Sequence, residues 1–129
     1  MKNFAYLLIL LSILSCRSDN KTVKPVDLHD IEAAVASAKG SCKKQSMDWL
    51  RTMLQKAEED RTKFAHGGQY IGEIALVKGR NGSAVYTNFG LGSGGIAYYL
   101  FDCGGNPITD FETISSKNLE DRKVIYSSL

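Results

Sequence analysis

Histidine is scarce in this chain, and neither sign of charge predominates. His29 and His66 are the only histidines among 129 residues, and neither is close to a cysteine in sequence. A metal centre needs three or four such ligands, so we expect no metal and no cofactor. The 16 basic and 14 acidic side chains leave a net charge of +2. Proteins that bind nucleic acid carry a basic face or stripe, so we expect no nucleic-acid partner.

The first apolar run is too short to cross a bilayer. The stretch "FAYLLILLSILS", residues 4–15, has about a dozen residues, whereas a spanning helix needs roughly 20. It follows Lys2 and precedes Cys16, an order typical of a secretory signal peptide. The residues Ile13-Leu14-Ser15-Cys16 resemble the lipobox of bacterial lipoproteins. The resemblance implies a signal peptide over residues 1–15 and a lipid such as palmitate on Cys16. The alternative is an ordinary secretory signal with a cysteine there by chance.

A lipid on Cys16 implies that the protein is anchored in the cell envelope. Each buried CH₂ contributes about 0.8 kcal/mol, and two or three acyl chains anchor stably where one does not. We expect the outer membrane, with the folded part in the periplasm or at the cell surface. Residues 16–26 are polar without a periodic apolar pattern, so we interpret them as a flexible tether. Residues 27–129 are enough for a single domain.

Two further cysteines remain, Cys42 and Cys103. In an exported domain with a small core, this pair predicts a disulfide. Closing a loop of about 60 residues contributes roughly 4 kcal/mol to stability on the loop-entropy argument. A catalytic thiol and a metal site are the alternatives, and no histidine nearby in sequence supports either.

Two amphipathic helices are predicted before any strand. Apolar residues recur at a spacing of three to four within residues 26–40, with Asp27 as N-cap and Gly40 as stop. A second apolar stripe lies within residues 46–68, with Ser46 as N-cap. A cation in a last helical turn complements the helix dipole, so His66 is interpreted as a cap at the C-terminus of this helix.

The pattern then changes to strands. "RNG", residues 80–82, predicts a type I′ hairpin between two strands, because Asn and Gly tolerate positive φ. The mostly apolar stretch 96–103 predicts a central strand, and residues 107–114 and 123–127 predict two more. The fold class is therefore α+β, with one or two N-terminal helices packed on an antiparallel β-meander of three to five strands.

Aromatic residues concentrate in the predicted sheet. Side chains alternate along a strand, so half of them should face away from the helices. Tyr98 and Tyr99 are adjacent and should point to opposite faces, one into the core and one towards a partner. With Tyr86, they are the candidate contacts with a protein partner. The alternative is that a last strand or helix covers this face.

No grouping of residues is typical of catalysis, so we predict no catalytic residue and no enzyme. The glycine-rich residues 90–95 lack the following helix that a phosphate-binding loop needs. Asp102 and Asn106 offer oxygen ligands, but their spacing is not that of a calcium loop. We interpret Asp102 as a residue that orders a turn through backbone amides.

The lipobox, the tether, the "MDWL" helix and the segment "YYLFDCGGNPI" together resemble small uncharacterised lipoproteins of Bacteroidetes-type bacteria. The resemblance covers about residues 42–108 and implies no particular chemistry. Our hypothesis is a membrane-anchored lipoprotein that binds an envelope protein or has a structural role. The alternatives are an inhibitor or immunity-type lipoprotein against an exported enzyme or toxin and, less favoured, a small hydrolase.

Replacing Cys16 by serine removes the sulfur that would carry the lipid. We expect the Cys16→Ser protein to lose fatty-acid labelling and to leave the membrane fraction, because a polar tether does not enter a bilayer. Metabolic labelling with a radioactive fatty acid, followed by cell fractionation, measures both properties. Unlabelled wild-type protein, together with a variant that still fractionates with the envelope, would contradict the lipoprotein hypothesis.

Overall fold

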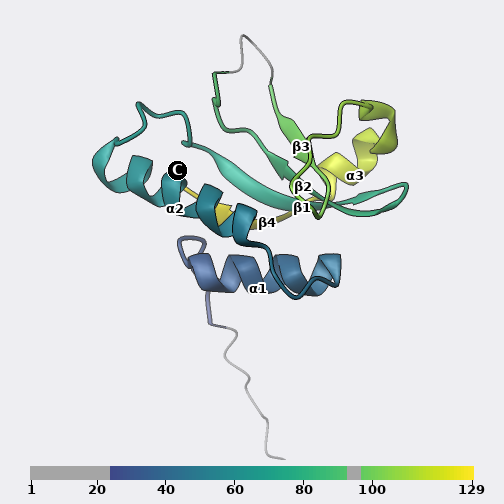
Figure 1. The fold of residues 1–129 in the computed structure, drawn as a ribbon, viewed down its shortest axis with the longest axis horizontal. Coiled ribbons are helices and arrows are strands. Elements are labelled where there is room, and N and C mark those ends of the chain that lie inside the picture. Colours follow the sequence, from purple (N-terminus) through teal and green to yellow (C-terminus); the bar gives the residue numbers. More distant parts are fainter. Residues whose placement is uncertain (1–23, 93–96) are drawn as a thin grey trace, which may run out of the picture.

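The computed structural model describes residues 24–92 and 97–129, so the predicted signal peptide, Cys16 and most of the tether lie outside the described residues. Two helices precede the first strand, and a short helix precedes the last one (Figure 1). The elements are α1 (Ile31–Cys42), α2 (Asp48–Lys63), β1 (Glu73–Gly79), β2 (Gly82–Thr87), β3 (Tyr99–Phe101), the 3₁₀ turn η1 (Phe111–Thr113), α3 (Ser116–Glu120) and β4 (Lys123–Ser127). The strands form one antiparallel sheet in the order β3-β2-β1-β4, which confirms the α+β prediction. Within the described ranges, no helix is long and apolar enough to cross a membrane.

α1 begins and ends later than the sequence predicts. Its N-cap is Asp30 rather than Asp27, and the Asp30 carboxylate accepts a hydrogen bond from the Ala33 amide at 3.0 Å. Gly40 does not stop the helix, which continues to Cys42 and ends where Lys43 adopts the left-handed conformation. Gly40 therefore lies within a regular helix, and a Cβ built on it would meet no atom within 4 Å.

α2 begins after Met47, whose buried side chain gives no capping hydrogen bond, so the predicted Ser46 cap is wrong. The helix ends at Lys63, because Phe64 turns left-handed and its amide bonds to the Asp60 carbonyl. The buried Asp60 carboxylate then accepts hydrogen bonds from two amides of the following loop, those of His66 and Tyr70. Burial would raise the pKa of Asp60, but these amides outweigh it and lower the pKa.

His66 lies beyond the end of α2, so its predicted role as a helix cap is wrong. Its backbone amide is held by Asp60 at 2.6 Å, and its Nε2 lies 2.6 Å from the Glu59 carboxylate. The prediction failed because Phe64, a residue without a sequence signal for positive φ, ends the helix first.

β1 and β2 are the two inner strands of the sheet, and β1 pairs with β2 on one side and β4 on the other. The predicted central strand, β3, lies at the edge instead. Four consecutive residues of β1, Ile74 to Val77, are buried, which requires cover on both faces of the sheet. In β3 only Leu100 is fully buried.

The β1–β2 hairpin forms where it was predicted, but with a different turn. Gly79 pairs with Gly82, so Arg80 and Asn81 are the two turn residues. Positive φ occurs at Gly82 (118°) and at neither turn residue, which excludes a type I′ turn. The strand predicted over 107–114 is also wrong: it is reduced to one bridge between Phe101 and Pro107, followed by η1.

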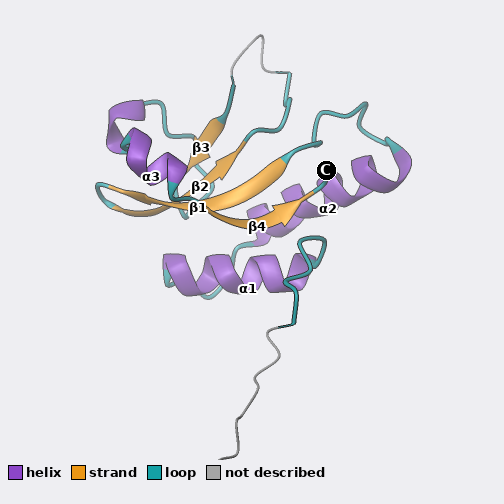
Figure 2. Cartoon of the chain, turned by 180° about the vertical axis from the view of Figure 1, so that it is seen from behind, coloured by secondary structure: helices purple, strands orange, loops and turns teal. Residues whose placement is uncertain are grey.

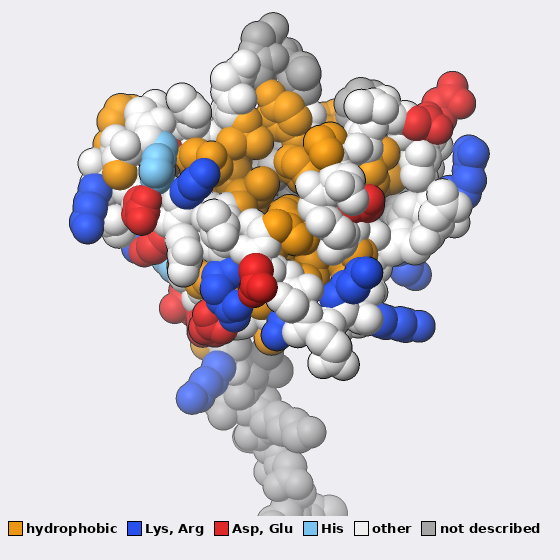
Figure 3. Space-filling view, viewed as in Figure 1, with side chains coloured by type: hydrophobic (Ala, Val, Ile, Leu, Met, Phe, Trp, Pro, Cys, Tyr) orange, Lys and Arg blue, Asp and Glu red, His pale blue; other side chains and the backbone are white. Residues whose placement is uncertain are grey.

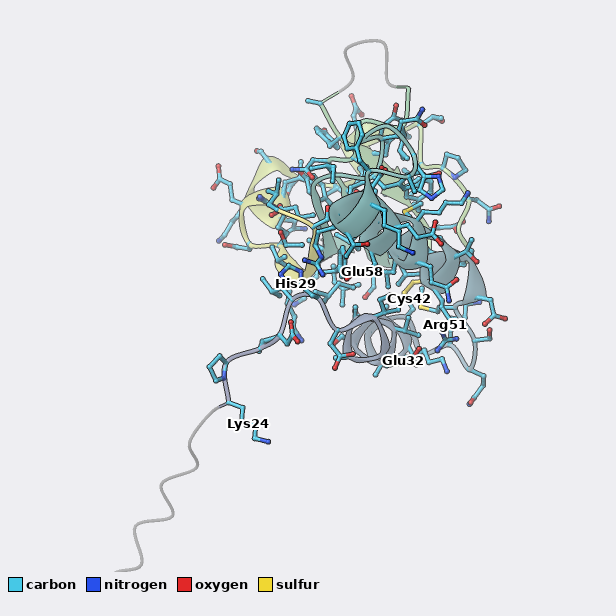
Figure 4. The ribbon with its side chains drawn as sticks, turned by 90° about the vertical axis from the view of Figure 1, so that its left-hand side faces the viewer. Lys24, His29, Glu32, Cys42, Arg51 and Glu58 are labelled. Atoms are coloured by element: carbon cyan, nitrogen blue, oxygen red, sulfur yellow. A yellow bond between two sulfur atoms is a disulfide. The ribbon has the colours of Figure 1, made fainter. Side chains whose placement is uncertain are left out.

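α1 and α2 cover one face of the sheet, here called the inner face, and α3 lies near the β1–β2 hairpin on the outer face (Figure 2). Apolar residues of α1, α2 and the sheet form the main core, and Val77, Ala84, Leu100 and Ile114 form a second core on the outer face. Figure 4 shows Arg51 of α2 directed towards Glu32 of α1. The two side chains form a paired hydrogen bond at 2.8 and 3.1 Å across the helices.

A disulfide joins Cys42 to Cys103, as predicted, with 5.7 Å between the Cα atoms. It connects the last residue of α1 to the turn that follows β3. Trp49 lies against the same turn, and its indole N–H donates to the Cys103 carbonyl at 3.3 Å. The helical layer and the edge of the sheet are thus held together at one junction.

Breaking this disulfide should greatly reduce stability. We expect the Cys42→Ala/Cys103→Ala protein to lose roughly 4 kcal/mol of unfolding free energy in urea titrations, because the bond closes a loop between residues 61 positions apart. Each single variant should lose nearly as much unfolding free energy as the double variant, because either substitution alone removes the bond. Single losses that add up to the loss of the double variant would show that the bond contributes little.

Candidate functional site

The inner face of the sheet is only partly covered by α1 and α2. Apolar side chains gather over one area above α2, towards β2 and β3 (Figure 3). From α2 onward, the half-buried hydrophobic side chains that pack against the main core are Trp49, Met53, Tyr70, Leu91 and Phe101. We call these five residues and Tyr99 the aromatic surface.

The Trp49 side chain is held in place by its neighbours. Its ring lies 5.6 Å from that of Phe101, centroid to centroid. Gly105 also lies against the ring: an added Cβ there would lie 2.7 Å from the indole, so only a glycine fits. Trp49 and Met53 are four residues apart on α2 and therefore share one face of the helix.

Tyr70 stands in the loop after α2 and packs edge to face on the buried Phe89, with 5.9 Å between ring centroids. The ammonium group of Lys56 lies 5.5 Å from the centre of the Tyr70 ring, within the range of a cation–π contact. The ring of His66 contacts Tyr70 edge to face. Tyr70 therefore has a defined orientation at this end of the surface.

Tyr99 belongs to the same face as Phe101. In the β2–β3 register Tyr99 is opposite Thr87, and Phe101 is opposite Val85 of the main core. Side chains two apart on a strand share a face, so Tyr99 lies on the inner face beside Phe101. Like Phe101, it is half-buried.

Tyr86 and Tyr98, the other two candidate contacts, lie on the outer face. Their rings stack at 5.7 Å with an angle of 29°. The Arg122 guanidinium lies 5.0 Å above the Tyr86 ring and forms an ion pair with Glu73 at 2.7 Å. Burial raises the pKa of Tyr86, and the positive charge of Arg122 opposes this shift.

The outer face is partly covered, which was the alternative considered for the exposed aromatic residues. Ile114 of the second core and Ile108 and Leu119, which pack against this core, all come from the segment after β3. Both Tyr86 and Tyr98 are packed against this second core. The opposite orientation of Tyr98 and Tyr99 is as predicted, but both are half-buried, so neither one is wholly core.

The residues considered for chemistry have structural contacts. Asp102 accepts hydrogen bonds from the Gly104 and Asn106 amides at 2.8 and 2.9 Å, which confirms its predicted role in the turn. The amide and side chain of Asn106 lower the pKa of Asp102. His29 lies with Nδ1 2.8 Å from the Ser127 carbonyl oxygen, far along the chain from His66. No group of three or more potential metal ligands occurs within residues 24–92 and 97–129.

No protein-family model, curated protein or solved structure matches this chain. The function is therefore inferred from the surfaces themselves. Sequence reasoning found Tyr99 but missed Trp49 and Met53 as surface residues. The available signal was their spacing of four on α2, with Trp49 beside the apolar stripe rather than on it.

Gly105→Ala tests how Trp49 is held. Gly105 has a φ of +86° and faces the indole, whereas Gly67 has a φ of +68° and open space around it. Both alanine variants carry the cost of positive φ, but only Gly105→Ala also crowds Trp49. We expect Gly105→Ala to lose about 1–3 kcal/mol more than Gly67→Ala in urea unfolding, with a shift in Trp49 fluorescence. Equal losses without a spectral change would contradict the contact.

Proposed function

We propose that this protein is a membrane-anchored lipoprotein that binds an envelope protein through the aromatic surface. The observation that carries the proposal is the group of half-buried side chains formed by Trp49 and Met53 of α2 with Tyr99 and Phe101 of the edge strand β3. Tryptophan, tyrosine, phenylalanine and methionine are enriched at the centres of protein interfaces.

The chemistry of the surface supports a protein partner over a substrate. The Trp49 ring packs on Gly105 and the Tyr70 ring packs on Phe89, so these two side chains lose little conformational entropy on binding. No pair of nucleophile and base stands among the side chains of the aromatic surface, whose only polar groups are the hydroxyls of Tyr70 and Tyr99 and the Trp49 indole N–H, which donates to the Cys103 carbonyl. A partner that buries them would gain from the hydrophobic effect and from tyrosine hydrogen bonds.

The position of the N-terminal segment supports the same function. Lys24 lies beyond α1, away from the sheet (Figure 4). The aromatic surface lies on the opposite side of α2 from α1 (Figures 1 and 3). With a lipid on Cys16, the tether would join the domain on the α1 side, away from the aromatic surface, which would stay accessible to a partner.

The test is an alanine scan with a partner purified from the envelope. Full-length protein in mild detergent is used to isolate the partner, and binding is then measured with both proteins purified. We expect Tyr99→Ala and Met53→Ala to weaken binding by roughly tenfold or more, since anchor residues contribute about 2 kcal/mol or more. The matched control is Tyr98→Ala, which removes the neighbouring tyrosine on the outer face.

Several outcomes would contradict this proposal. Loss of binding only in Tyr98→Ala or Tyr86→Ala would move the contact to the outer face. An exported enzyme or toxin that loses activity when bound would identify the protein as an inhibitor or immunity-type lipoprotein. Turnover of an ester, glycan or peptide that His66→Ala abolishes, with no partner captured, would identify a hydrolase.

A further inference from the structure

A groove of about 750 Å³ runs between α1 and α3 at the end of the sheet that carries the β1–β2 hairpin. Figure 2 shows α3 and the C-terminal end of α1 at this end of the sheet, with the sheet between them. Leu76 and Val77 of β1 contribute apolar groups to the groove, and Ser37 and Ser41 line its α1 side. This volume is within the range of about 300–1,000 Å³ typical of ligand sites.

The charge of the groove is unbalanced. Lys78, Lys117 and Lys123 line it, and Asp121 is the one acidic lining residue. Among the residues that the structure describes, none of the three lysines forms an ion pair. The chain as a whole is close to neutral, so this local excess of positive charge is a property of the groove.

Gly40 keeps the α1 side of the groove open. A glycine within a helix is less favourable than alanine by about 1 kcal/mol. Neither a positive φ nor a close neighbour requires a glycine here, because a Cβ would have no atom within 4 Å. Gly40 lines the groove, so any larger side chain at this position would occupy space in it.

The walls of the groove are tied to the sheet. Ser41 at the end of α1 is hydrogen-bonded to Ser83 of β2, with 2.7 Å between the hydroxyl oxygens. Asn118 of α3 donates to the Lys78 carbonyl at 2.8 Å. The disulfide at Cys42 holds the same end of α1. The groove is therefore preformed, which lowers the entropic cost of binding.

We propose that this groove binds an extended acidic segment of a protein partner, with glutamate or aspartate side chains at the lysines and apolar side chains against Leu76 and Val77. The lysines supply the charge complementarity, and β1 supplies the apolar contact. A flat anionic membrane would not fill a concave site or reach its floor. The site is independent of the aromatic surface, so either proposal can fail without the other.

The probe is a fluorescein-labelled short peptide of alternating glutamate and leucine, titrated with the full-length protein in neutral detergent micelles. Fluorescence anisotropy should show saturable binding that weakens as salt is added. Lys117→Glu/Lys123→Glu should weaken binding by at least about tenfold, because two attractions become repulsions. The control Lys24→Glu/Lys63→Glu changes the net charge equally at exposed lysines outside the groove, and should leave binding unchanged.

A second pair of variants tests the shape of the groove without changing charge. Gly40→Met should weaken peptide binding because its side chain enters the groove, while unfolding measurements should show that the protein remains folded. Ala33→Met, at an exposed position of α1 outside the groove, should bind like the wild type. Tyr99→Ala should also leave this binding unchanged.

Four results would overturn the proposal. The first is that the acidic peptide shows no saturable binding, and the second is that both charge-reversed pairs of variants weaken peptide binding equally. The third is that the Gly40→Met protein binds the peptide as tightly as the wild type does. The fourth is that a lysine–leucine peptide binds as tightly as the acidic one. An anionic glycan or vesicles of anionic lipid could also displace the labelled peptide. If either one does so at a lower concentration than the unlabelled peptide does, the groove is assigned to that class of ligand instead.

Discussion

The junction of Cys42, Cys103 and Trp49 holds both proposed surfaces in place. The disulfide fixes the end of α1 to the turn after β3, and Trp49 packs on that turn through Gly105. Trp49 and Phe101 are part of the aromatic surface, so its geometry depends directly on this contact. The groove depends on it as well, because its α1 side ends one residue before the disulfide.

Incomplete cover of the sheet is the second physical constraint. A domain of about 100 residues buries a smaller fraction of its surface on folding than a larger one does. α1 and α2 leave Tyr99 and Phe101 of the edge strand β3 half-exposed on the inner face, and the five-residue α3 covers only part of the outer face. The two surfaces that result differ in chemistry, one aromatic and the other basic, which suits them to different contacts.

The fold was predictable where the signal is periodic and local. The two helices, the hairpin at residues 80–82 and the strand at 123–127 follow from apolar spacing and turn residues. The central position of β1 could have been read from its unbroken apolar run, but strand order depends on contacts between distant segments. The left-handed Phe64 has no signal in sequence. In the candidate site, the alternation of side chains along a strand was enough to identify Tyr99 as a candidate contact. The groove could not be predicted from the sequence, because it joins residues of α1, β1, α3 and β4.

The most direct test of the account is site-specific photo-crosslinking in living cells. A photoreactive phenylalanine analogue replaces Tyr99 on the aromatic surface or, as a control, Ala33 on the exposed side of α1. If the aromatic surface binds the partner, position 99 gives a discrete crosslinked adduct and position 33 gives none. An adduct from position 33 alone, or no adduct from either position when the protein is present at its normal level, would contradict the proposed binding.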